Sequence, residues 1–224
     1  RPAAAFPANA ADISVAAQGP IVELSVTETV KGRPDLAEVG AGVTTEAPTA
    51  VEAMRLNAEQ MARVVARIRS LGISADDVQT TGINLNAAYD YNGQRQVFRG
   101  YQASNRVSVT LRKVDDTGKV LDALVAAGAT DLSGPSFSIA DDTAAQAQAR
   151  KAAVQKAEQM AREYAGWSGY TGVRILKISE AMHAGPPMPM MRGVAAEAAM
   201  ATTPVEPGLV GTSVTVSVTY EMTR

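Results

Sequence analysis

The order of its hydrophobic patterns is the feature that most constrains the fold of this chain. Segments with alternating apolar and polar side chains, typical of half-buried strands, come in adjacent pairs, and segments with helical spacing separate these pairs. Paired strands joined by short turns are typical of antiparallel sheets, because parallel strands need a long crossover connection. The order therefore predicts an α+β fold: two-layer α/β sandwich units with mostly antiparallel sheets and helices packed on the sheet faces.

The same patterns place the individual elements. Strands are expected at residues 21–30, 36–45, 78–91, 94–113, 132–140, 173–182 and 214–222, and helices at residues 49–71, 119–127 and 143–166. Asn92-Gly93 predicts a tight hairpin between two strands. The first helix carries apolar residues from Met54 to Leu71, and Gly72 predicts its end. The last strand has the clearest alternation, with inward-facing residues Val214, Val216, Val218, Tyr220 and Met222.

Two groups of small residues indicate close packing. Alanines recur at every fourth position from Ala149 to Ala165, and such a stripe lets a helix approach a sheet or another helix closely. Gly40-Ala41-Gly42 is similar to the start of a dinucleotide-binding fingerprint, but it lacks the third glycine and lies inside an expected strand. We interpret these glycines as positions that permit a bulge or a close approach.

The chain of 224 residues is long enough for one large domain or two small ones. We expect a flexible tether at residues 1–12, a first α/β unit at residues 13–100 and a second at residues 101–224, with the terminal strand free to pair in the first unit. Residues 183–208 are rich in proline and methionine, lack regular periodicity and predict a long loop in the second unit.

Composition excludes several classes of function. The net charge is −2, which argues against a nucleic-acid-binding protein because such proteins need a basic surplus. The chain has no cysteine, so disulfides, thiolate metal sites and cysteine nucleophiles are excluded. Its one histidine, His183, cannot form a site that needs two imidazoles. The sequence has no apolar run long enough to span a membrane.

No standard catalytic motif is present, and we predict no catalytic residues and no cofactor. An enzymatic site without a recognised motif would need a buried polar cluster around Tyr101, Asn105 or Arg150. Three pairs of aspartates precede expected helices or strands, where we interpret them as caps and turn formers; they are Asp76-Asp77, Asp115-Asp116 and Asp141-Asp142.

The methionine-rich loop has three interpretations. Thioethers and an imidazole are ligands that select Cu(I), and the copper candidates are Met182, His183, Met188, Met190 and Met191. Methionine also adapts to uneven apolar surfaces, so the loop would suit contact with another subunit or a partner. We predict assembly contacts through Met188, Met190 and Met191 rather than a metal site, and disorder is the third interpretation.

Short segments in order along the chain match a known family. They are Pro34-Asp35, Val43-Thr44-Thr45, residues 50–57, Gly72-Ile73, residues 76–80, residues 100–105, Gly134-Pro135-Ser136-Phe137, residues 149–152 and residues 204–208, followed by the terminal strand. Together they resemble the SIMPL-domain family, which includes bacterial periplasmic proteins and an animal protein that associates with a Pelle-like kinase. The resemblance implies two-layer α/β units and, for bacterial members, a place in the cell envelope; some members are linked to oxidative-stress tolerance. It implies no catalytic residues.

These observations predict a non-catalytic protein of the bacterial cell envelope that assembles with copies of itself and contributes to stress tolerance. The chain begins with Arg1-Pro2 rather than Met, which an artificial start or the removal of a signal peptide would explain. We expect a periplasmic protein exported with a cleaved signal peptide. The alternatives are a monomeric protein-interaction module and a Cu(I)-binding or redox-buffering protein.

Overall fold

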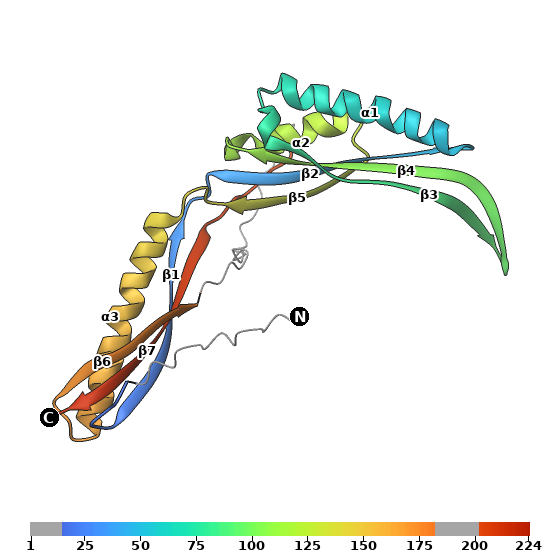
Figure 1. The fold of residues 1–224 in the computed structure, drawn as a ribbon. Coiled ribbons are helices and arrows are strands. Elements are labelled where there is room, and N and C mark those ends of the chain that lie inside the picture. Colours follow the sequence, from blue (N-terminus) through green and yellow to red (C-terminus); the bar gives the residue numbers. More distant parts are fainter. Residues whose placement is uncertain (1–14, 182–201) are drawn as a thin grey trace, which may run out of the picture. The chain divides into compact units, whose positions relative to one another are not determined.

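The computed structural model describes residues 15–181 and 202–224 (Figure 1). The strands are β1 (Ile21–Gly32), β2 (Leu36–Ala47), β3 (Val78–Asn92), β4 (Arg95–Leu111), β5 (Asp131–Ser138), β6 (Gly172–Ala181) and β7 (Val210–Thr223). The helices are α1 (Ala50–Ser70), α2 (Thr117–Ala126) and α3 (Thr143–Trp167), with short 3₁₀ turns at Ala75–Asp77 and Val114–Asp116. Within these residues each expected strand and helix is present, and the α+β class with antiparallel sheets is confirmed.

The chain forms two compact units, each built from separate stretches of sequence. The four-stranded unit contains residues 31–142 and 202–211, and the three-stranded unit contains residues 15–30, 143–181 and 212–224. Residue 100, where the sequence suggested a boundary, lies inside β4. The terminal strand β7 lies in the same sheet as β1.

In the four-stranded unit the sheet has the order β3-β4-β2-β5. β2 pairs with β4 from Ala37 opposite Leu111 to Ala47 opposite Tyr101. The β3–β4 hairpin continues to its tip, where Asn92 lies opposite Arg95. Residues 88–100, here called the hairpin arm, therefore extend beyond β2 as a two-stranded ribbon (Figure 1).

Helices α1 and α2 cover one face of this sheet (Figure 1). The core between them and the sheet is built from small and medium-sized apolar side chains. Its buried members are Ala37, Val39, Ala41, Val43, Met61, Val64, Ile68, Val107, Val109, Leu111, Val120, Leu121 and Leu124. Val205, close to the start of the last described segment, packs against the same core.

Helix α1 begins and ends where its sequence directs. The Thr49 side chain accepts a hydrogen bond from the backbone N–H of Glu52, and Gly72 adopts the left-handed conformation (φ +80°) just after the helix. Met54, the first apolar residue of the expected inner face, is 37% exposed. The buried row instead begins at Ala53 and continues through Asn57.

The three-stranded sheet has the order β1-β7-β6, and α3 packs on one face. The alanine stripe of α3 is fully buried there, as the four-residue spacing predicted: Ala149, Ala153, Ala157, Ala161 and Ala165. Facing it are Leu24 and Val26 of β1 and the predicted inward row of β7, from Val214 to Tyr220. The methyl side chains of the stripe leave room for these larger strand residues.

Hydroxyl groups pair across the other face of this sheet. Thr27 and Thr215 lie 2.7 Å apart at their Oγ1 atoms, and Thr29 Oγ1 lies 2.8 Å from Ser213 Oγ. This register shows that β1 and β7 run antiparallel. It also confirms that the polar residues of β7 alternate away from the core.

Candidate functional site

Two glycines make room for polar side chains on the sheet face opposite α1 and α2. A Cβ atom on Gly42 would lie 2.2 Å from Asp131 Oδ1, and one on Gly40 would lie 2.2 Å from Ser133 Oγ. Arg106 of β4 reaches across β2 to both β5 residues, at 2.9 Å from Asp131 Oδ1 and 3.1 Å from Ser133 Oγ. The two glycines therefore permit the close approach predicted for them, here by the side chains of Asp131 and Ser133. Arg106 is paired with these same two side chains.

A shallow hollow lies at the base of the hairpin arm. It has a volume of about 160 Å³ and is lined by Glu46, Ala47, Pro48, Ala88, Arg99, Gly100 and Tyr101. Arg99 Nη2 donates to Glu46 Oε1 at 2.6 Å, and Arg99 Nη1 lies 3.3 Å from Asp90 Oδ1. Gly100 (φ +152°) is required there, since a Cβ atom would lie 2.6 Å from the carbonyl oxygen of Ala47. The charges that line the hollow thus neutralise one another.

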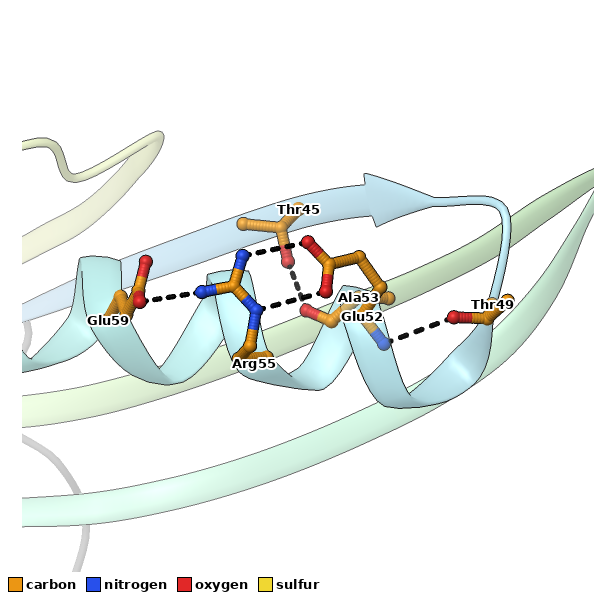
Figure 2. A network of polar contacts seen from close by, with 6 residues as sticks. All are labelled: Thr45, Thr49, Glu52, Ala53, Arg55 and Glu59. Carbon is orange, nitrogen blue, oxygen red and sulfur yellow. Dashed lines mark hydrogen bonds and ion pairs between the residues drawn. The ribbon is translucent and has the colours of Figure 1, made fainter.

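Beside the hollow, the first turns of α1 carry a network of polar contacts (Figure 2). Arg55 bridges two carboxylates, donating to Glu52 Oε1 at 2.7 Å and to Glu59 Oε1 at 2.6 Å. The hydrogen bonds from Arg55 lower the pKa of the Glu52 carboxyl below its ordinary value, and those carboxylates raise the pKa of Arg55. Thr45 Oγ1 donates to the carbonyl oxygen of Ala53 at 2.8 Å and so ties β2 to the helix.

Asn57 provides a buried connection between α1 and the sheet. Its Nδ2 donates to the carbonyl oxygens of Val43 in β2, at 2.9 Å, and of Ala103 in β4, at 3.0 Å. The residue is 3% exposed. Sequence reasoning missed it, although its position four residues after Ala53 and four before Met61 placed it in the inner row.

A second buried polar residue, Glu221, lies in the three-stranded unit. Its Oε1 accepts hydrogen bonds from the backbone N–H groups of Gln18 and Gly19, the latter at 2.6 Å. Its Oε2 accepts from Arg174 of β6. The Arg174 guanidinium, helped by the two N–H groups, holds the pKa of this carboxyl below its ordinary value. Glu221 thus fixes the segment that leads into β1.

Sequence comparisons identify the family. The SIMPL family, described as "Protein of unknown function (DUF541)", matches residues 22–220. The chain belongs to the SIMPL family. It is 32% identical over 200 residues to the "26 kDa periplasmic immunogenic protein" of Brucella melitensis, covering 84% of this chain and 79% of that protein. It is 28% identical over 181 residues to "Uncharacterized protein YggE" of Escherichia coli K12, covering 81% and 74%.

The three residues considered for the polar cluster of an enzyme lie in two different units of this SIMPL chain. Tyr101 and Asn105 lie on β4, where the Tyr101 ring packs edge to face against Phe98 at 5.5 Å. Arg150 lies in the three-stranded unit and forms an ion pair with Glu180 at 2.6 Å. Asn105 Oδ1 is buried without a hydrogen-bond partner among the described residues.

Two of the aspartate pairs do not cap the elements that follow them. The Ser74 side chain, not an aspartate, caps the turn at Ala75–Asp77, and Asp77 instead pairs with Arg112 at 2.9 Å. Asp116 precedes α2 but its side chain makes no capping hydrogen bond, because it belongs to a 3₁₀ turn that runs directly into the helix. The prediction of caps at these two pairs was therefore wrong, whereas their predicted place in turns is confirmed, since both pairs lie in 3₁₀ turns.

The remaining predicted site residues fall outside the described part of the SIMPL chain. Met182, His183, Met188, Met190 and Met191, proposed for copper or for assembly, lie within residues 182–201. Across residues 15–181 and 202–224, no group of three His, Cys, Asp or Glu side chains is placed to hold a metal ion. The helices among those residues are too short or too polar to cross a bilayer.

Proposed function

We propose that this SIMPL protein is a non-catalytic periplasmic protein that assembles with copies of itself through the β3–β4 hairpin. The observation that carries the proposal is the exposed apolar surface of the hairpin arm. On one face of the ribbon Tyr91 is 76% exposed and Phe98 is 51% exposed, and on the other face Val97 is 52% exposed. A surface of this kind is typical of a protein contact.

The construction of the arm supports the same proposal. Beyond Tyr101 the two strands pair only with each other, and an isolated two-stranded hairpin is marginally stable in water. Tyr89, Phe98 and Tyr101 stack edge to face, with ring centroids 5.8 Å and 5.5 Å apart. Such contacts give about 0.5–1.5 kcal/mol each, which stiffens the ribbon but leaves much of its apolar surface in water. A second chain would remove that surface from water.

The hollow at the base of the arm supports a structural role rather than catalysis. Its arginine, Arg99, is paired with Glu46 and Asp90, and all three side chains are about half exposed. These groups are in contact with water and pair with one another, which suits a structural role at the base of the arm.

Periplasmic location is supported by the name of the Brucella melitensis relative, the 26 kDa periplasmic immunogenic protein. Fractionation of cells that express the complete reading frame tests it: we expect the mature chain in the periplasmic fraction. Recovery of the unprocessed chain in the cytoplasm would contradict this part of the proposal. Protection from oxidative stress stays a prediction, which survival of a deletion strain under peroxide would test.

Replacement of the arm residues tests assembly. We expect the variant Tyr91→Ser/Val97→Ser/Phe98→Ser to have a lower mass in light scattering than the wild-type chain, with an unchanged far-UV spectrum. Trp167→Ser is the control, because Trp167 is exposed but lies in the three-stranded unit. An unchanged mass for the triple variant would refute the role of the arm. A monomeric wild-type chain would favour the protein-interaction module instead.

The methionine loop keeps its proposed role in assembly through Met188, Met190 and Met191. The sequence pattern predicts that residues 184–207 can be deleted without loss of fold, but a deletion must spare residues 202–209, since Thr203 N donates to Asp122 Oδ2 at 3.0 Å and Val205 packs against the core. We therefore expect deletion of residues 184–201 to lower the mass without loss of fold. An unchanged mass would exclude the loop from assembly.

A further inference from the structure

Strand β3 is an outer strand of the four-stranded sheet, and its long outer edge is open among the described residues. It runs for 15 residues, from Val78 to Asn92, and of the described strands only β4 pairs with it. Two register shifts, at Thr80/Gly82 and Ala88/Tyr89, bracket a regular stretch between them. Along that stretch every second residue directs its backbone N–H and C=O groups away from β4, where another strand can bind them.

The other three sheet edges carry features that oppose strand addition. β5 has 8 residues and contains Gly134-Pro135. β1 carries charged residues along its length, and β6 combines charged residues with a register shift between Ile175 and Lys177. Charges, prolines and bulges are the devices that protect an edge from pairing. β3 has two register shifts of its own, but the stretch between them, from Gly82 to Ala88, carries no charge, no proline and no shift, so this part of its edge is open to pairing.

Apolar side chains accompany the open edge. Ile83 is 57% exposed and Leu85 is 42% exposed. Leu85 lies opposite Ala103, which is buried against α1, so both residues belong to the helix-bearing face of the sheet. Asn84 and Asn86 occupy the opposite face. A partner strand would therefore meet one apolar row and one amide row.

We propose that β3 pairs antiparallel with β3 of a second copy of this chain, joining the two four-stranded sheets edge to edge. This inference rests on the proposed self-assembly and names its surface. Two-fold symmetry centred on Asn84 places Ile83 of each copy opposite Leu85 of the other and Asn84 opposite itself. Because the strand is uncharged in this region, no like charges meet when it pairs with itself.

The charges at the two ends of the strand favour the same arrangement. In this register Asp76, just before β3, approaches the hairpin tip of the second copy. The tip carries Arg95, which lies opposite Asn92, whereas Arg99 at the base of the arm is already paired with Glu46 and Asp90. A second copy is therefore complementary to this edge in charge as well as in side-chain pattern, and the symmetry closes the pair rather than extending it.

A charge exchange tests the register. We expect Ile83→Lys/Leu85→Lys to weaken association about tenfold or more, since it places lysines opposite lysines. We expect Ile83→Lys/Leu85→Glu to restore association, because each lysine then meets a glutamate of the other copy. Val125→Lys on α2 is the control, because Val125 is 54% exposed and lies away from the edge. Sedimentation velocity measures the masses, and far-UV spectra check the fold.

A cross-link tests contact directly and does not depend on charged variants that fold. The chain has no cysteine, so Asn84→Cys in the full chain introduces a single thiol. We expect a disulfide-linked dimer under mild oxidation, and none for Val125→Cys. If the wild-type chain assembles but Asn84→Cys stays unlinked and both charge variants keep the wild-type mass, the β3 edge is not the surface, whereas the proposed function stands. A wild-type chain that is monomeric at high concentration would overturn both.

Discussion

The buried amide of Asn57 should contribute to stability more than any exposed residue of α1. Asn57→Leu keeps the number of side-chain heavy atoms and the branching at Cγ but removes both hydrogen bonds to the sheet carbonyls. The two lost bonds cost about 1 kcal/mol each. Leaving two buried carbonyl oxygens with fewer donors adds about 1 kcal/mol, and burial of the leucine returns about the same amount. The expected loss is therefore about 2 kcal/mol in the free energy of unfolding.

Thermal unfolding followed by circular dichroism measures this loss. For a chain of this size, about 2 kcal/mol corresponds to a decrease of about 4–8 °C in the melting temperature. Glu59→Leu, two residues along on the exposed side of α1, should change stability by less than about 0.5 kcal/mol. Equal melting temperatures for the two variants would refute the role of the buried amide.

An acid at the same position gives a prediction with a distinct pH dependence. In Asn57→Asp the new carboxyl faces two carbonyl oxygens, so burial and these acceptors raise its folded-state pKa above its unfolded value. The variant should therefore lose stability relative to wild type as the pH rises from the unfolded-state pKa to the folded-state pKa of this carboxyl. Part of the lost stability should return in acid. A difference from wild type that does not vary between about pH 4 and pH 8 would contradict this environment.

Four further substitutions test the three-stranded unit. Val216→Asp should cost about 3 kcal/mol or more by burying an unpaired charge, whereas Ser217→Asp on the opposite face should cost about 1 kcal/mol or less; equal effects in chemical denaturation would contradict the alternation. Tyr220→Phe should raise stability by about 1 kcal/mol, since the Tyr220 hydroxyl is buried without a partner among the described residues, and a clear decrease in melting temperature would show a missed partner. Glu221→Gln should lower the melting temperature near neutral pH but not in acid. The pKa of Glu221 is lowered by Arg174, so its contribution is complete above the ordinary value of 4.5 and is lost as the pH falls below it; a pH-independent difference would refute this.

The regular elements could be predicted from the sequence because their periodicities are strong. Alternation along β7 places Val216 and Val218 inward without knowledge of any partner, since the strand period of two assigns each residue to a face. The alanine stripe of α3 likewise predicted its own buried face. Both inferences depend only on local geometry, which short stretches of sequence determine.

The site geometry could not be predicted in the same way. The pattern assigned Met54 to the inner face of α1 because it is apolar, whereas the buried row contains Ala53 and Asn57. A polar residue is expected on the exposed face of a helix unless its hydrogen-bond partners are known. The partners of Asn57 are backbone carbonyl groups of two strands, which the sequence pattern does not identify. Burial of Glu221 has the same origin: alternation places it on the polar face of β7, and the distant residues Gln18 and Gly19 supply its hydrogen-bond donors.

The projecting arm illustrates a further limit of sequence patterns. Asn92-Gly93 predicted the hairpin, and its tip lies there. The pattern did not show where β2 would stop pairing with β4, because register depends on which residues of two strands lie opposite each other. That register leaves residues 88–100 without a third strand and exposes the aromatic side chains on which the proposed function rests.

The mass of the wild-type chain in solution tests the central claim most directly. One chain has a mass of 23.3 kDa. Sedimentation velocity on the complete chain, from low to high micromolar concentration, should show a closed assembly of at least two copies whose population grows with concentration. A single species of one-chain mass across the whole range would contradict self-assembly.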